Sequence, residues 1–403
     1  METSMEFTEL AREKEKLSAI FAAKTGQAAK EIRVIASPYR ISPLGAHIDH
    51  QGGPVLGMTI NAYTLLAYLP AKNDRVRLRS LNYPGRVSFR LSQPEENTGS
   101  FWGNYARGAA LALKEAFAIQ NGIDGLLMGH LPGGGLSSSA SVLLAYIQAL
   151  ADANGIRPAP WELVTLTQAA ENIHIGLKNG ILDQTSIVFG QSGRLLHIDT
   201  VKPDVVALEP SETADPYRIL IAYSGYSREL TTTGYNSRVS ECREAARLLS
   251  AFGEDTPAKQ LADVNEAVFE AHGGKLPEHL HRRARHFFSE KVRVARGVDA
   301  WSRGAMETFG HLMNRSCQSS IEDYECGSQP IHDLQQIVSQ SRGVFGSRFS
   351  GGGFGGCVVG FVAPQEAADA AAEIQIAYQR RHPEVADAAG VYLVDSVSGL
   401  QQP

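Results

Sequence analysis

Three glycine-rich segments constrain this chain more than any other feature, because clustered glycines let a backbone turn sharply or approach a ligand closely. They lie at residues 45–57, 133–135 and 351–356, in a chain of 403 residues with 39 glycines. The sequence shows no internal repeat and no low-complexity stretch. We therefore expect the three segments to be loops of a globular fold, placed where something must come close to the backbone.

The composition is that of a globular protein with a sizeable core. Hydrophobic residues make up 43% of the chain and charged residues 20%, and 38 basic residues against 43 acidic ones give a formal net charge of −5. At roughly 100 to 200 residues per domain, the length predicts two or three domains. The mildly acidic balance offers no general attraction to a phosphate backbone or an anionic membrane. We therefore expect neither nucleic acid nor a membrane as a partner.

Cysteine usage and the absence of targeting patterns indicate a location inside the cell. The four cysteines are too sparse and too irregularly spaced for a disulfide framework, which favours a reducing compartment. Residues 1–24 lack the basic-then-apolar order of a signal peptide, and no stretch approaches ~18 consecutive apolar residues. The sequence thus predicts a cytoplasmic protein, and it leaves the oligomeric state open.

Hydrophobic periodicity predicts a mixed α+β first half. Apolar and β-branched residues at 55–69 precede alternating patterns at 76–78 and 87–91, which together predict an antiparallel meander. Helical spacing then recurs in three segments, at 102–120, 138–154 and 161–174.

A polar, turn-rich interval near residue 210 separates this half from the next. The predicted domains are therefore residues 1–209 and 210–403. The second domain begins with a strand at 218–223 and ends on a strand, helix and strand at 357–362, 365–381 and 391–394.

The loop before the helix at 138–154 combines glycines, hydroxyl groups and a helix N-terminus. It consists of Gly133, Gly134, Gly135, Leu136, Ser137, Ser138 and Ser139. A helix N-terminus offers free N–H groups with a partial charge of about +0.5, so the pattern favours phosphate binding. The alternative is a serine-capped helix start without a ligand. It is not the G-x-x-x-x-G-K-[ST] loop, because no lysine follows the last glycine.

The third glycine segment formally matches a dinucleotide fingerprint. Gly351, Gly353 and Gly356 fit G-x-G-x-x-G, which would suggest a dehydrogenase. That fingerprint follows a strand and opens a helix in a first βαβ unit, whereas these glycines precede an apolar strand pattern near the C-terminus. The context therefore disfavours a dehydrogenase, and a plain glycine turn is the remaining alternative.

The first glycine segment contains side chains suited to binding or catalysis, namely Arg40, His47, Asp49 and His50. Two histidines and an aspartate within four residues suit zinc, but no clear further ligand is nearby. The same groups can hydrogen-bond a polyhydroxylated substrate.

Two carboxylates, Glu171 and Asp183, are each most simply interpreted as surface charges. Beside the serine loop they would supply what phosphoryl transfer needs, a magnesium ligand and a proton acceptor.

Together, these segments resemble the GHMP kinase superfamily and, within it, the galactokinase-like sugar kinases. The galactokinase signature G-R-x-N-x-I-G-E-H-T-D-Y-x-G-G is matched at Arg40, Gly45, His47, Asp49, Gly52 and Gly53. The serine loop corresponds to the family's second motif and residues 346–356 to its third. Blocks around Glu171, at 180–184 and at 234–238 are also similar to family blocks, so the resemblance spans nearly the whole chain.

The resemblance implies a two-domain fold, with an N-terminal mixed α/β domain and a ferredoxin-like C-terminal domain around an active-site cleft. It also implies ATP and Mg²⁺ as cofactors, and transfer of the γ-phosphate to the anomeric hydroxyl of a sugar. Asp183 would be the catalytic base, and Arg40 would stabilise developing charge. Ser138 and Glu171 would hold magnesium, while the loop from Gly133 to Ser139 would cradle phosphate.

The same resemblance implies a set of sugar-binding residues drawn from all three motifs. They are Ala46, His47, Asp49, His50, Gly180, Tyr235, Gly352 and Gly353.

Three positions depart from the galactokinase signature, since Ser42, Ala46 and His50 replace its Asn, Glu and Tyr. In that pattern the Glu receives the C6 hydroxyl, so its loss removes a hydrogen bond worth about 1 to 3 kcal/mol in a closed site. The loss also removes a negative charge. A carboxylate at C6 would be repelled by Glu but tolerated beside Ala46, and His47 or His50 could donate to it.

The sequence therefore predicts ATP-dependent phosphorylation of D-galacturonate to α-D-galacturonate 1-phosphate, and the segment is similar to the corresponding motif of galacturonokinases. Two alternatives stay open. One is a galactokinase acting on D-galactose, with a weakened C6 contact. The other is a non-catalytic sugar and ATP sensor of the same fold.

Overall fold

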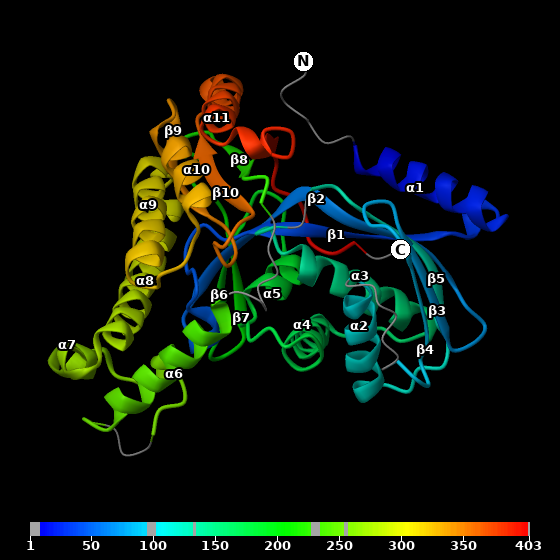
Figure 1. The fold of residues 1–403 in the computed structure, drawn as a ribbon, viewed down its shortest axis with the longest axis horizontal. Helices are drawn as coiled ribbons and strands as arrows, with labels where there is room; N and C mark the ends of the chain where they lie inside the picture. Colours follow the sequence, from blue (N-terminus) through cyan, green and yellow to red (C-terminus); the bar gives the residue numbers. More distant parts are fainter. Residues whose placement is uncertain (1–8, 95–101, 132–133, 227–233, 254–256, 402–403) are drawn as a thin grey trace.

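The computed structural model describes residues 9–94, 102–131, 134–226, 234–253 and 257–401. The chain forms two units side by side, each built on its own β-sheet (Figure 1). Within the described ranges, no helix is long and apolar enough to cross a membrane.

The first unit contains a seven-stranded sheet in the order β4-β3-β5-β2-β6-β7, with β1 paired to β2. Its strands are β1 (Arg33–Ile41), β2 (Val55–Pro70), β3 (Arg75–Ser80), β4 (Arg86–Arg90), β5 (Ile123–Gly129), β6 (Leu195–Asp199) and β7 (Asp204–Leu208). The 16-residue β2 is central, because it pairs antiparallel with β1, β5 and β6 along its length.

The predicted antiparallel meander is wrong in its connectivity. β3 and β4 form an antiparallel hairpin, but β3 lies parallel to β5, which separates it from β2. The side-chain patterns explain this order. β3 reads Arg-Val-Arg-Leu-Arg-Ser, apolar on one face only, whereas β5 reads Ile-Asp-Gly-Leu-Leu-Met-Gly and is buried over most of its length. The more apolar strand takes the interior position.

Helices cover both faces of this sheet. They are α1 (Leu10–Thr25), α2 (Gly103–Ala116), α3 (Ser138–Ala153), α4 (Pro160–Ala169) and α5 (Leu182–Phe189). Side chains alternate across β2, so Leu66 packs in the core with α2 and α3, whereas Leu65 packs with Leu17 of α1. Figure 1 shows α1 on the opposite side of the strands from α2 and α3.

The second unit contains a four-stranded, fully antiparallel sheet in the order β11-β8-β10-β9. Its strands are β8 (Arg218–Tyr223), β9 (Val344–Phe349), β10 (Cys357–Val362) and β11 (Gly390–Val394). With helices between β8 and β9 and between β10 and β11, this is the split βαβ arrangement of ferredoxin-like domains. The predicted fold class is therefore confirmed.

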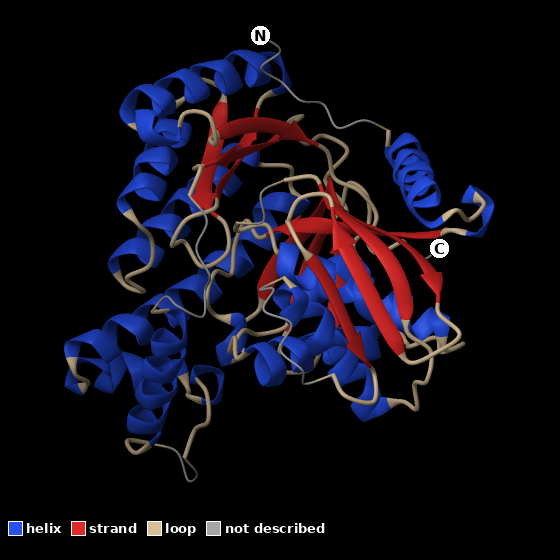
Figure 2. Cartoon of the chain, turned by 45° about the vertical axis from the view of Figure 1, so that its right-hand side comes forward, coloured by secondary structure: helices blue, strands red, loops and turns tan. Residues whose placement is uncertain are grey.

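In the described part of the chain, six helices belong to this second unit, and they cover both faces of its sheet (Figure 2). They are α6 (Tyr235–Ser250), α7 (Glu266–His272), α8 (Glu278–Ser302), α9 (Met306–Glu322), α10 (Gln329–Gln340) and α11 (Ala367–Arg381). The 25-residue α8 matters most for the site below, because it brings buried polar side chains to the first glycine segment.

The chain passes from one sheet to the other between β7 and β8, and on that ground we keep residue 210 as a proposed domain boundary. The last described residues return to the first unit. Gln401 exchanges backbone hydrogen bonds with Ala36 of β1, and the Val397 amide donates to the carbonyl of Thr59 in β2 (3.2 Å). These contacts tie the two units together at their edge.

Candidate active site

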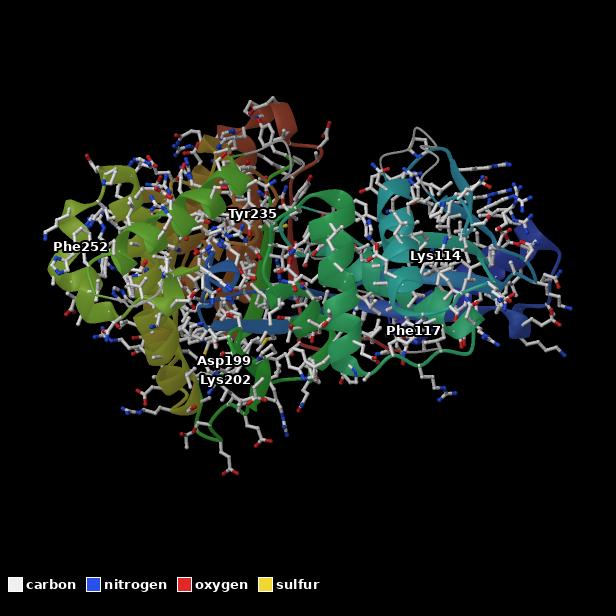
Figure 3. All side chains as sticks on the ribbon, turned by 90° about the horizontal axis from the view of Figure 1, so that it is seen from below. Lys114, Phe117, Asp199, Lys202, Tyr235 and Phe252 are labelled. Atoms are coloured by element: carbon white, nitrogen blue, oxygen red, sulfur yellow. The ribbon has the colours of Figure 1, made fainter. Side chains whose placement is uncertain are left out.

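A cavity of about 680 Å³ lies where the two units meet. Its walls come from β1, the serine loop, the start of α5 and the third glycine segment, which are far apart in the sequence. Tyr235, at the start of α6, lines the cavity from the second unit, and Figure 3 labels it near the first unit. The predicted cleft between the units therefore contains a cavity.

Most of the predicted site residues meet in this cavity. Its lining includes Arg40, Ala46, His47, Asp49, Gly134, Gly135, Ser137, Ser138, Ser139, Glu171, Asp183, Tyr235, Gly352 and Gly353. Three predicted residues do not line it, namely Leu136, His50 and Gly180. Leu136 is fully buried in a hydrophobic core, since its side chain is apolar. Gly133 lies outside the described residues.

Arg40 and Asp183 form an ion pair at the centre of the cavity wall. The Nε and Nη2 atoms of Arg40 lie 2.7 and 2.6 Å from Oδ1 of Asp183, and Nη1 donates to the carbonyl of Gly135 (3.0 Å). Asp183 stands in the first turn of α5, where the free N–H groups favour a carboxylate. Strand β1 and helix α5 thus fix a charged pair that faces the cavity.

Asp49 lies behind this pair and is held by backbone groups. Its Oδ2 accepts from the Leu182 amide (3.2 Å), and a Cβ on Gly180 would stand 2.4 Å from that oxygen. Gly180 therefore acts by leaving space for Asp49. Burial first, and then the neighbouring Asp183 carboxylate, raise the pKa of Asp49 to about 6.

Glu171 is a fully buried carboxylate on a π-helical turn at Ala170–Ile175. Burial, followed by repulsion from Asp183, raises its pKa to about 7, against opposing hydrogen bonds from Asn179 and Ser139. Asn179 donates to Oε2 (2.6 Å), whereas Oε1 is buried without a hydrogen-bond partner in the described part of the chain. A buried carboxylate oxygen without a donor is suited to a cation.

The two later glycine segments touch each other across the units. A Cβ on Gly134 would stand 2.7 Å from the Cα of Gly356, and one on Gly135 would stand 2.7 Å from the carbonyl oxygen of Ser350. Gly135 also has a φ of +84°. Glycine is thus required here for close contact between loops as well as for any ligand.

His47 is a buried ring and His50 a half-buried one, and both are engaged by neighbouring side chains. Burial lowers the pKa of His47 well below its usual value and that of His50 to about 3. His47 stacks on Tyr324 at 4.6 Å, and His50 Nε2 lies 2.9 Å from the Tyr324 hydroxyl. Among the described residues, no three His, Cys, Asp or Glu side chains converge as a metal site. The geometry therefore does not support the zinc alternative.

Sequence reasoning missed two charged residues that the second unit contributes. Glu290 of α8 accepts from the amides of Gly45 (2.8 Å) and Ala46 (3.2 Å), and Arg348 of β9 lines the cavity. Burial alone would raise the pKa of Glu290, but Arg293, His286 and Arg348 hold it at about 2. No local spacing links Glu290 to the first glycine segment, so no sequence signal identifies it. Arg348 lies within the third motif at residues 346–356, and that motif is a signal that could have found it.

Comparisons with known proteins agree with this geometry. The family model of the GHMP kinases N-terminal domain matches residues 104–191, and that of the GHMP kinases C-terminal domain matches residues 298–378. The galactokinase galactose-binding signature matches residues 19–70.

Curated relatives cover most of the chain. A galacturonokinase of Arabidopsis thaliana is 43% identical over 384 residues, which span 90% of this chain and 91% of that protein. A galactokinase of Roseiflexus sp. (strain RS-1) is 35% identical over 332 residues, or 82% of this chain and 83% of that protein.

Among solved structures, Lactococcus lactis galactokinase complexed with galactose is similar at a TM-score of 0.87 and 32% identity, covering 96% of this chain and 99% of that one. A mevalonate kinase, at a TM-score of 0.62 and 16% identity, shares the fold alone. The chain belongs to the GHMP kinase superfamily and, within it, to the galactokinase-like sugar-1-kinases, enzymes that use ATP and a small sugar.

Proposed function

We propose that this enzyme transfers the γ-phosphate of ATP to the anomeric hydroxyl of D-galacturonate, giving α-D-galacturonate 1-phosphate and ADP. The observation that carries the proposal is Ala46 in the cavity wall, where the galactokinase signature has Glu. A carboxylate at that point would repel a sugar acid, and Ala46 removes the repulsion. The 43% identity to a galacturonokinase adds support.

Asp183 would accept the proton of the anomeric hydroxyl. Its side chain is 20% exposed, and both Arg40 contacts go to Oδ1, which leaves Oδ2 available to a substrate. A base must reach the proton that it removes, and an oxygen on the cavity wall meets that condition. Arg40 would orient this carboxylate and offset charge on the attacking oxygen.

The N-terminus of α3 would bind the phosphates. The helix begins at Ser138 and runs for 16 residues, so its first N–H groups lack partners within the helix. Ser137, Ser138 and Ser139 line the cavity there, and the Ser137 hydroxyl is buried without a hydrogen-bond partner among the described residues.

The donor set at Glu171 fits Mg²⁺. Magnesium in phosphoryl transfer is commonly held by one or two carboxylates together with substrate phosphates, and the free Oε1 of Glu171 meets that description. Glu171 and Ser138 would hold the ion, and Ser139 would position Glu171. When bound, the ion would neutralise charge on the phosphates.

The remaining predicted residues would surround the sugar. Asp49, Tyr235 and His47 would contact its hydroxyl groups, and Gly352 and Gly353 would leave room for the ring. His50 and Gly180 would not touch the sugar. His50 would hold the Tyr324 hydroxyl, and Gly180 would leave space for the Asp49 side chain. The four cysteines are free and buried, which supports the proposed cytoplasmic location.

A second candidate is phosphorylation of D-galactose, favoured by the TM-score of 0.87 to a galactokinase complexed with galactose. The test is ADP release with ATP and magnesium, offering galacturonate, galactose, glucuronate and arabinose in parallel. Galacturonate well ahead of galactose is the expected result. Galactose ahead would replace the proposal by the second candidate, and no turnover on any sugar would indicate a sensor.

A further inference from the structure

Arg348 is a buried guanidinium in the cavity wall to which the proposed reaction assigns no task. It stands on β9, is 1% exposed and lines the cavity. Its Nε donates to the carbonyl of Phe349 (3.0 Å), and Nη1 donates to the hydroxyl of Ser316 (3.1 Å). No acceptor within the described residues engages Nη2. A buried arginine with a free donor at a cavity can accept an anionic group of a ligand.

The charges around Arg348 do not balance. Glu290 is the one carboxylate among the described groups that act on it, and Arg293 neutralises Glu290 through a contact of 2.6 Å. The nearby His47 and His286 rings have lowered pKa values, mainly because of burial, so they carry no charge at neutral pH. The buried cluster of Arg348, Arg293 and Glu290 therefore has a net charge of about +1, which favours an anion beside it.

Hydrogen bonds link this positively charged cluster to Ala46, the position at which the chain lacks the Glu of the galactokinase signature. The Ala46 amide donates to Glu290 Oε1 (3.2 Å), which also accepts from Ser316 (2.6 Å), and Ser316 accepts from Arg348. Ala46 and Arg348 thus lie on one hydrogen-bonded cluster and line the same cavity. A glutamate at position 46 would supply the missing negative charge, whereas Ala46 leaves that charge to the ligand.

We propose that Arg348 pairs with the C6 carboxylate of the sugar acid and thereby determines the preference for a uronate over a neutral sugar. This inference rests on the proposed function and names the residue that enforces it. Nη2 provides the donor, Ala46 provides the space, and Glu290 with Ser316 fixes the guanidinium from behind. His47 lines the same cavity, and its Nε2 is engaged by the Cys326 thiol (3.4 Å).

The test compares Arg348→Gln with Arg293→Gln, using galacturonate and galactose as substrates. Both variants remove one positive charge from the same cluster, but Arg293 does not line the cavity. Losing one partner of a desolvated charge pair weakens binding by roughly 30-fold or more. Arg348→Gln should therefore lower the galacturonate to galactose ratio of kcat/KM by at least about 30-fold, mainly through KM. Arg293→Gln removes the same charge but keeps the Nη2 donor, so it should lower that ratio by a clearly smaller factor.

Wild-type enzyme provides a second measurement if the Arg348 variant does not fold. Galacturonamide replaces the carboxylate with a neutral group of similar shape, and its KM should exceed that of galacturonate by about 30-fold or more. Equal KM values would overturn the role of Arg348, as would an equal loss on both sugars in Arg348→Gln. Neither result would affect the proposed function, which fails separately if wild-type enzyme prefers galactose.

Discussion

Arg40 binds a single oxygen of Asp183, with Nε at 2.7 Å and Nη2 at 2.6 Å from Oδ1. The pair joins β1 to the first turn of α5, two elements separated by more than 140 residues. Because the guanidinium holds Oδ1 from one side, Oδ2 keeps a fixed direction relative to the cavity wall. Under the proposed function, Oδ1 would anchor the carboxylate to Arg40 and Oδ2 would accept the proton.

Replacing Asp183 with Asn should abolish most turnover while the site stays assembled. The amide keeps the shape and one acceptor for Arg40 but cannot take a proton, so kcat should fall by roughly 10²- to 10⁴-fold. Calorimetry should show nucleotide affinity within about threefold of wild type. Asp204→Asn, an exposed change on β7, is the matched control and should be fully active. Substantial residual turnover in Asp183→Asn would exclude Asp183 as the base.

The sequence predicted the parts of the site that are contiguous and missed those that the fold assembles. Arg40, Asp49 and the serine loop are each recognisable within a short motif, and the fold class followed from them. By contrast, Glu290 reaches the first glycine segment from a position more than 200 residues away. Local pattern carries no information on such contacts, because they depend on how the second unit docks.

Secondary structure shows the same division. Strands at β2, β8 and β10 were predicted because they are long apolar runs or clear alternations. The position of β5 between β2 and β3 was not predicted. Which strands pair depends on how the side chains of the whole sheet are buried, and not on the sequence of one strand. Helices α8 and α9 were also missed, because polar residues such as Glu290 interrupt their buried faces.

Replacing Ala46 with Glu should shift the substrate preference toward the neutral sugar. The new carboxylate would face the cavity and repel the carboxylate of galacturonate, and like charges in a desolvated site are worth several kcal/mol. We expect kcat/KM for galacturonate to fall by about 100-fold or more. The value for galactose should rise or stay level, as a C6 hydroxyl contact becomes available.

Ala46→Gln is the matched control for this change, because Gln has the size of Glu without its charge. It should lower activity on both sugars to a similar extent, through crowding alone. The measurement is steady-state kinetics of all three proteins on both sugars. An unchanged preference in Ala46→Glu would mean that the charge at position 46 does not set the substrate specificity.

Replacing Gly134 with Ala should disturb the contact between the two glycine loops. The added Cβ would stand 2.7 Å from the Cα of Gly356, so one loop must move away from the other. Displacing groups in an active site by about 1 Å can reduce rates on the order of 100-fold. Gly274→Ala is the control, because its Cβ would meet no atom within 4 Å. Equal kcat/KM values in the two variants would show that the loops tolerate separation.

Replacing Glu171 with Gln should stabilise the ligand-free protein at high pH while it impairs catalysis. Burial raises the pKa of this carboxyl from 4.5 to about 7, so its ionisation opposes folding as the pH rises through that range. The penalty is under about 1 kcal/mol at pH 5 and reaches about 3 kcal/mol at pH 8. Urea unfolding without magnesium or nucleotide should therefore show a gain in Glu171→Gln at pH 8 that shrinks at pH 5. A gain of the same size at both pH values would mean that the carboxyl titrates normally. Burial would then not destabilise the charged form of Glu171, and this argument for a bound cation would fail.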